Sequence, residues 1–392
     1  MKKVSYLITI LISFSCTEPY LLQTSNFEEA LVIEATITNE LKTQQIKLSK
    51  TYRLEENGPE FVENANVSIE DNLGNVYPFI ENNDVYESQT PFQAIAGRNY
   101  KLTIIANGKT YTSSQEVLGT VNPIQNVEVN DINLAGERGA EIRVKAFDPT
   151  NSSKYYRYEF EETYKIIAPK WLPYTVKVDP NTLEFIFTPR AYEARTCYST
   201  FKSNELILHT TSNLSEDRVD FMVRFIPVSN PIIMHRYSIL VKQYIQNLAS
   251  YTYYNTLKTM SGSGSILSQN QPGFFSGNIK CDSNPNEKII GFFDVSSISS
   301  QRIFFNFEEV FPNTLQPAYF YDCFYCQELD PFLCPGAYDW TLVSDRIFAT
   351  SSLNTIPTYL LYYSGPNPLN LIPPPCGDCT TFSSNVVPSF WQ

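Results

Sequence analysis

The stretch Tyr100-Lys-Leu-Thr-Ile-Ile-Ala-Asn-Gly-Lys-Thr-Tyr-Thr-Ser113 indicates the fold class of this chain. Its two runs, 100–105 and 109–113, alternate between apolar and polar side chains and flank Asn107 and Gly108. An Asn-Gly pair between two alternating runs is the strongest short-range signal for a β-hairpin, because both residues tolerate a positive φ. The stretch therefore predicts two neighbouring antiparallel strands.

Similar short runs surround this hairpin at regular spacing. On its N-terminal side they occur at residues 31–37, 44–50, 65–70 and 76–80, with turn-like segments between them. About seven short strands in one series are typical of an immunoglobulin-like sandwich. We therefore predict that residues 28–120 form an immunoglobulin- or transthyretin-like β-sandwich.

A second series of strands follows and contains one helix. Alternating runs occur at residues 141–147, 155–167, 205–209, 219–226 and 237–244, and further strands are predicted at 288–295 and 302–307. The run 155–167 places Tyr156 and Tyr158 on one face and Arg157 and Glu159 on the other. Residues 248–260 break the alternation and predict a short helix. We expect a mostly β chain, with a larger β-rich domain over 121–311 and a Cys- and Pro-rich region over 312–392 that packs on it.

The first sixteen residues predict export and lipidation. Lys2 and Lys3 precede an apolar run over residues 4–14, which is shorter than the roughly 20 residues of a membrane-spanning helix and typical of a signal peptide. Cleavage before Cys16 would leave an N-terminal thiol that can carry lipid. We predict a signal peptide over 1–15, lipidation at Cys16 and a tether over 16–27; a plain secretory peptide is the alternative.

Charge and composition exclude one class of partner. Removing Lys2 and Lys3 with the signal leaves 27 basic against 41 acidic residues, so 27 − 41 = −14. Nucleic-acid binding rests on cationic contacts to phosphate, so it is not expected. The 26 Tyr and 26 Phe fit strand content, with ligand stacking as the alternative.

Seven cysteines remain after Cys16. They are Cys197, Cys281, Cys323, Cys326, Cys334, Cys376 and Cys379. In an exported protein all seven are disulfide candidates, because crosslinks stabilise a loop-rich region without a large core. The pairs 323/326 and 376/379 also have zinc-ribbon spacing, so a metal site or a zinc-dependent hydrolase is the alternative. Seven is odd, so one thiol stays free unless it meets another chain, and the order of the cysteines leaves the connectivity open.

No catalytic constellation is evident in the sequence. His209 and His235 are the two histidines, each within or beside a strand pattern, and no Gly-x-Ser-x-Gly is present. The stretch Asp282-Ser-Asn-Pro-Asn-Glu287 begins like a calcium loop, but lacks the glycine at its sixth position and the glutamate at its twelfth. We therefore expect neither an enzyme nor a bound cofactor or metal.

Motifs spread along the chain resemble one family. They are Ser15-Cys16-Thr-Glu-Pro19, Leu31-Val-Ile-Glu-Ala35, Ala65-Asn-Val-Ser-Ile-Glu-Asp-Asn-Leu-Gly74, Gly97-Arg-Asn-Tyr-Lys-Leu102, Arg236-Tyr-Ser-Ile-Leu-Val-Lys-Gln-Tyr244, Gly277-Asn-Ile279, Ile290-Gly-Phe-Phe293, Gln301-Arg-Ile303, Cys376-Gly-Asp-Cys379 and Pro388-Ser-Phe-Trp391. The pattern resembles the Bacteroidota outer-membrane lipoproteins catalogued as domain of unknown function 4249. The resemblance implies a non-enzymatic accessory protein of a TonB-dependent receptor (a β-barrel), lipid-anchored at the outer membrane and exposed on the cell surface. Capture of a small nutrient, peptide or glycan, or gating of the receptor, would be its role. A structural or adhesive surface protein that binds proteins or glycans is the alternative.

Overall fold

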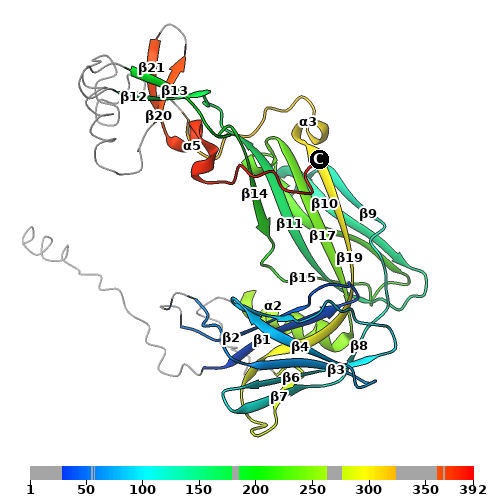
Figure 1. The fold of residues 1–392 in the computed structure, drawn as a ribbon. Coiled ribbons are helices and arrows are strands. Elements are labelled where there is room, and N and C mark those ends of the chain that lie inside the picture. Colours follow the sequence, from blue (N-terminus) through cyan, green and yellow to red (C-terminus); the bar gives the residue numbers. More distant parts are fainter. Residues whose placement is uncertain are drawn as a thin grey trace, which may run out of the picture.

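The computed structural model describes residues 29–53, 56, 58–178, 185–262, 276–323, 360–364 and 367–392. The predicted signal peptide, Cys16 and most of the tether region lie outside these residues. Among the helices that are described, none is long and apolar enough to cross a membrane. The described chain is mostly β, as predicted, and Figure 1 shows two stacked β units with a smaller group of hairpins at one end.

The Asn-Gly hairpin forms as predicted. Strands β6 (Asn99–Ala106) and β7 (Lys109–Ser113) pair antiparallel, with Ala106 opposite Lys109. The turn residues Asn107 and Gly108 have φ angles of 53° and 72°. Positive φ at both central residues is what a twisted two-residue hairpin requires.

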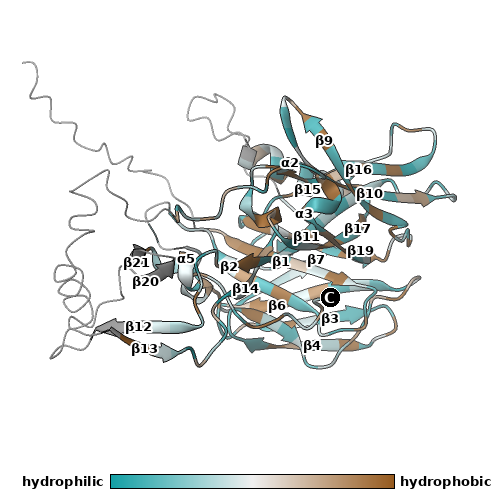
Figure 2. Cartoon of the chain, turned by 90° about the horizontal axis from the view of Figure 1, so that it is seen from above, coloured by the Kyte–Doolittle hydropathy of each residue, from teal (hydrophilic) through white to brown (hydrophobic). Residues whose placement is uncertain are grey.

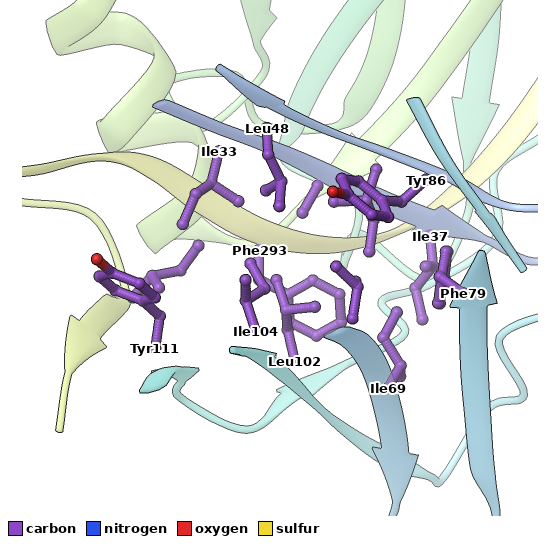
Figure 3. Packing of buried hydrophobic residues seen from close by; sticks show 14 of the residues in the cluster. Ile33, Ile37, Leu48, Ile69, Phe79, Tyr86, Leu102, Ile104, Tyr111 and Phe293 are labelled. Carbon is purple, nitrogen blue, oxygen red and sulfur yellow. The ribbon is translucent and has the colours of Figure 1, made fainter. Parts of the chain in front are cut away.

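The first unit is a β-sandwich, and every second side chain of its strands points into the core. Its remaining strands are β1 (Leu31–Thr38), β2 (Gln45–Lys50), β3 (Asn66–Asp71), β4 (Val76–Asn82), β5 (Val85–Ser88), β8 (Glu116–Val117) and β18 (Ile279–Cys281). Buried Ile33, Leu48, Ile69 and Leu102 face one another across the sandwich (Figure 3). Alternation places every second residue inside, which is why these strands contribute one apolar face each.

Strand β19 (Ile289–Asn306) joins the two units. Its first half pairs parallel with β1, from Leu31 opposite Ile289 to Thr38 opposite Ser296. Its second half pairs antiparallel with a strand of the second unit. The two separate strands predicted at 288–295 and 302–307 are therefore one strand of 18 residues. The prediction was wrong because the mostly polar residues 296–301 between the two apolar runs are typical of a turn. In the structure they cross the junction of the two units and stay hydrogen-bonded to neighbouring strands.

The second unit is also a sandwich. One of its layers is the end of a 14-stranded sheet that continues through β19 into the first unit; this layer contains β14 (Thr196–Lys202), β15 (Ile207–Thr210), β11 (Tyr155–Ile167), β17 (Arg236–Gln246) and the second half of β19. The other layer is a separate three-stranded sheet of β9 (Asn126–Leu134), β10 (Glu137–Asp148) and β16 (Asp217–Pro227). Tyr156, Tyr158, Ile142 and Val144 lie in the core between them. Hydrophobic and hydrophilic positions mix along the strands of both units (Figure 2). Two short helical turns, η1 (Pro231–Ile233) and α3 (Phe307–Val310), flank this sandwich.

Helix α2 (Leu248–Gly262), predicted over 248–260, covers the junction of the two units. Its Tyr254 lies over the guanidinium of Arg157 on β11, 5.2 Å from ring centre to Cζ. Near it Asp294 of β19 is 1% exposed and accepts a hydrogen bond from Ser296 Oγ at 2.6 Å. Burial raises the pKa of Asp294, against the opposing charge of Arg157. Two charged groups, one on β11 and one on β19, are thus buried beside helix α2.

Candidate functional site

The most distinctive surface lies at the end of the molecule farthest from the first sandwich, and we call it the tip. It contains the hairpins β12–β13 (Tyr174–Val178 and Phe185–Pro189) and β20–β21 (Leu360–Ser364 and Asn367–Ile372), followed by α5 (Pro374–Gly377) and η2 (Cys379–Thr381). Figure 1 shows these elements together beyond the upper ends of β11 and β14. Isolated two-stranded hairpins are marginal in water, so the tip needs other contacts to hold its shape.

Two disulfides supply part of that support. Cys197 of β14 bonds Cys379, 182 residues later, and Cys323 bonds Cys376, 53 residues later. The predicted disulfide-rich C-terminal region is thereby confirmed, and Cys376 and Cys379 each have a different partner. That pairing consumes both thiols of the second Cys-x-x-Cys, which is incompatible with a zinc ribbon at this motif.

Asp378, between those two cysteines, ties the hairpin β12–β13 to the crosslinked segment. Its Oδ2 accepts hydrogen bonds from Arg190 Nη1 and from Tyr192 Oη, both at 2.9 Å. The side chains of Arg190 and Asp378 are only 7% and 9% exposed. Its Oδ1 accepts from the backbone N–H of Thr380 and so caps the 3₁₀ turn that carries Cys379. Burial, with Asp378 beside it, raises the pKa of Tyr192.

An aromatic cluster fills the base of the tip. Phe320 lies 5.6 Å from Tyr164 of β11 and 5.9 Å from Phe382 of the C-terminal segment, as measured between ring centres. Tyr319 donates from its hydroxyl to the carbonyl of Pro375 at 3.0 Å. These rings pack around the buried disulfide of Cys197. The base of the tip is therefore a small core of its own, joined to the second sandwich through β11.

The outer part of the tip presents apolar side chains to solvent. Ile186 and Phe187 of β13 are 47% and 50% exposed, and Tyr192 and Tyr321 are 53% and 41% exposed. Successive residues of a strand point to opposite faces. Because Ile186 and Phe187 are each about half exposed, both faces of strand β13 are partly open to solvent, although strand β12 contacts strand β20 of the neighbouring hairpin.

The last residues fasten the tip region to the second sandwich. Trp391 packs on Tyr198 of β14 and on Phe304 of β19, with ring centres 4.9 and 5.7 Å apart. Arg302 lies over the ring of Phe390 at 3.6 Å. The C-terminal segment thus crosses the outer face of the sheet, because Arg302 and Phe304 alternate with core residues of β19.

The other predicted cysteines have different outcomes. Cys281 was a disulfide candidate, but it is free and 2% exposed in β18, inside the core of the first sandwich. It lies opposite Tyr111 of β7, at the end of the molecule away from the tip, so the tip cysteines are out of its reach. Cys326 and Cys334 lie outside the described residues, as does Cys16. Within the described ranges no cluster of three His, Cys, Asp or Glu side chains could hold a metal ion.

The two histidines lie apart. His209 of β15 stacks on Phe221, 4.6 Å between ring centres, and burial lowers its pKa. His235 precedes β17 beside Lys165, and burial together with that lysine lowers its pKa. They flank opposite ends of β11, so they do not form a joint site.

Sequence reasoning missed the polar residues that hold the tip together. Arg190 and Tyr192 lie far from Asp378 in sequence, and nothing in their local pattern distinguishes them from exposed loop residues. The one available signal was the acidic residue inside Cys376-Gly-Asp-Cys379. A carboxylate enclosed between two crosslinked cysteines must find donors nearby, because a buried charge without partners is costly.

Comparison with known proteins places the chain among relatives of unassigned function. No curated protein matches it. A solved structure described as "Biofilm associated protein - B domain" is 8% identical, with 69% of this chain and 85% of that chain covered, but its TM-score of 0.12 supports no common fold. Residues 17–302 match the family described as "Domain of unknown function (DUF4249)", and the chain belongs to this family.

Proposed function

We propose that this protein is a lipid-anchored accessory protein of the outer membrane that binds a TonB-dependent β-barrel receptor through its tip. In this role it helps to capture a nutrient or to gate its uptake, without catalysing a reaction. The observation that carries the proposal is the pair of exposed apolar residues, Ile186 and Phe187, on a hairpin that disulfides and a buried ion pair hold in place.

Preorganisation makes such a surface suited to binding. Ordering a mobile loop at an interface costs free energy that a rigid one does not lose. The base of the hairpin β12–β13 is closed where the backbone N–H of Arg190 donates to the carbonyl of Pro173 at 2.9 Å, and the hairpin is anchored to the C-terminal segment where the Arg190 side chain pairs with Asp378. Aromatic side chains on rigid supports are typical of the residues that contribute most to protein interfaces.

The position of the tip agrees with a tether at the other end. The described chain begins at Glu29, beside β1 of the first sandwich. Cys16 precedes Glu29 by 13 residues, so an extended tether spans at most about 45 Å. The tip lies at the opposite end of the molecule (Figure 1), where a lipid-anchored protein would present it to a partner.

Affinity purification from detergent-solubilised native membranes tests the proposal. We expect the wild-type chain to recover a β-barrel receptor and the double variant Ile186→Ser/Phe187→Ser to lose it, since a central aromatic anchor is worth about 2 kcal/mol or more. Leu73→Ser is the matched control, because Leu73 is 66% exposed on a turn of the first sandwich. It should recover the receptor normally.

Two results would contradict the proposal. Recovery of a lone monomer would remove the receptor as partner. Recovery of other surface proteins or glycans without a β-barrel would favour the structural or adhesive alternative. Cys16→Ala should separately release the protein from the membrane fraction if lipid is attached there.

A further inference from the structure

Buried polar atoms without a hydrogen-bond partner gather at the junction beneath helix α2. Within the residues that the structure describes, four such atoms lie on neighbouring strands there: Thr38 Oγ1 of β1, Arg157 Nε of β11, Gln246 Oε1 of β17 and Asp294 Oδ1 of β19. The four residues are 2%, 8%, 4% and 1% exposed. Strands β11, β17, β19 and β1 are consecutive in one sheet. Native proteins leave few buried polar atoms unpaired, so this concentration requires an explanation.

Two of these atoms belong to side chains that already interact. Gln246 Nε2 donates a hydrogen bond to Asp294 Oδ2 at 3.4 Å, while Gln246 Oε1 and Asp294 Oδ1 have no partner in the described chain. An amide and a protonated carboxyl group can form two parallel hydrogen bonds, because each of them offers one donor and one acceptor to the other. The structure shows the first of these bonds. A proton on Asp294 Oδ1 would make the second and satisfy both remaining atoms.

The ionised form of Asp294 has no such arrangement. Four titratable groups surround the pair: Arg157 and Glu159 of β11, Tyr244 of β17 and Tyr254 of α2, whereas β1 contributes threonines at positions 36 and 38. Arg157 donates to Glu159 and lies over the rings of Tyr244 and Tyr254, 4.1 and 5.2 Å from Cζ to the ring centres. Burial raises the pKa of both tyrosines, which keeps them neutral. Arg157 is thus the one cation facing Asp294 in the described chain, and it forms its ion pair with Glu159 instead.

The pair lies where the two units are joined. Gln246 ends β17, and its Nε2 also donates to Ser250 Oγ of α2 at 2.8 Å. Asp294 lies in the half of β19 that pairs with β1 of the first sandwich, and it accepts from Ser296 Oγ at 2.6 Å. Burial raises the pKa of Asp294 and outweighs the charge of Arg157 and the hydrogen bonds from Ser296, Ser250 and Gln246, all of which lower it. The fold therefore favours the protonated carboxyl group.

We propose that Asp294 and Gln246 share a proton as an acid–amide pair, and that this pair is a pH-sensitive lock that holds helix α2 over the junction of the two units. With the proton in place, both hydrogen bonds form, and β17, β19 and α2 are tied together. After ionisation the second bond is lost and a carboxylate oxygen faces the amide oxygen, so the helix is held less tightly. A fold that raises the pKa of an acid loses stability as pH rises from the unfolded value to the raised one, so the lock is closed at low pH and opens as pH rises. The lock does not depend on the receptor-binding function proposed above.

Hydrogen–deuterium exchange of the full chain, followed by mass spectrometry, tests the inference. We expect the protection of residues 248–262, relative to an unstructured peptide, to fall in wild type between about pH 4 and about pH 8, by about tenfold for each unit by which the pKa of Asp294 exceeds 3.8. Asp294→Asn should stay protected at every pH, because an amide–amide pair makes both hydrogen bonds without a proton. Gln246→Leu removes the acceptor, so its protection should stay low and show no rise at low pH. Asp131→Asn is the matched control, because Asp131 pairs with Arg138 on the hairpin β9–β10; it should behave as wild type.

A carbon-13 NMR titration of the aspartate carboxyl groups in the wild-type chain checks the proton directly. The signal absent from Asp294→Asn belongs to Asp294, and we expect it to titrate at a pH above 3.8. Titration at or below that value would overturn the inference. So would wild-type protection of α2 that does not change with pH, or a pH dependence that persists in Asp294→Asn or in Gln246→Leu. An equal pH-dependent loss of protection in the hairpin β6–β7 would also overturn it, because the whole fold rather than the junction would then respond.

Discussion

Removing the longer-range disulfide tests how the tip is held to the body. The double variant Cys197→Ala/Cys379→Ala opens a crosslink between residues 182 apart, both fully buried. Because Cys323–Cys376 stays intact and shortens the loop, about 130 residues of free chain separate positions 197 and 379 in the unfolded state. For a loop of that length, the chain-entropy relation gives a stabilisation of about 5 kcal/mol from the crosslink. The same relation gives about 4 kcal/mol for the 53-residue loop closed by Cys323–Cys376. Because measured effects are often smaller, we expect a loss of about 3–5 kcal/mol for the first pair and about 1 kcal/mol less for Cys323→Ala/Cys376→Ala.

Urea unfolding followed by tryptophan fluorescence measures the two losses. Trp171 lies beside the buried disulfide and Trp391 lies on the outer face of the sheet, so both report on the region concerned. Cys281→Ala is the matched control, since it also removes a buried thiol but breaks no crosslink. Its loss should be limited to the cavity it leaves, on the order of 1 kcal/mol.

One pattern of results would refute the reasoning. If the 197/379 variant lost no more stability than Cys281→Ala, the crosslink would not constrain the unfolded chain as supposed. A larger loss for the shorter loop would show that packing around the sulfur atoms, rather than loop length, determines the effect.

Two further perturbations probe the junction between the units. The pKa of Asp294 is raised from 3.8 by burial, against the opposing charge of Arg157, so its ionised form costs stability that grows as pH rises through that shifted pKa. Asp294→Asn should therefore be more stable than wild type at pH 7 and about as stable as wild type at pH 4, as measured by thermal unfolding. A variant that is less stable than wild type only at pH 7 would show instead that Arg157 requires the charge of Asp294. A Cβ on Gly277 would lie 1.7 Å from the carbonyl oxygen of Gly291, so Gly277→Ala should cost about 1–3 kcal/mol in urea unfolding. Gly119→Ala, with open space around it, is the matched control and should be within about 1 kcal/mol of wild type; equal effects would contradict the close approach.

Local pattern was enough for the elements that neighbouring residues decide. The hairpin at Asn107 and Gly108 forms because the turn geometry is a property of those two residues. The helix at 248–262 was identified because its residues interrupt a period of two. The crosslinked C-terminal region also followed from composition, since five of the seven cysteines after Cys16 occur there.

Connections between distant segments could not be predicted in this way. The partners of Cys197 and Cys323 depend on which loops meet at the tip, and many pairings of seven cysteines fit the same order. The segments β18 and the first half of β19 belong to the series assigned to the second domain, yet they pack in the core of the first sandwich. No local signal indicates that one strand contributes to both units.

Within a few residues, strand β11 shows both what the sequence pattern determines and what only tertiary packing determines. The sequence determined the alternation, and Tyr156 and Tyr158 are buried in the core as it requires. The same alternation placed Arg157 on the opposite face, and helix α2 covers that face and leaves Arg157 only 8% exposed. Period-two patterning is a local consequence of backbone geometry, whereas burial depends on what another part of the chain places over each face, and only the folded chain decides that.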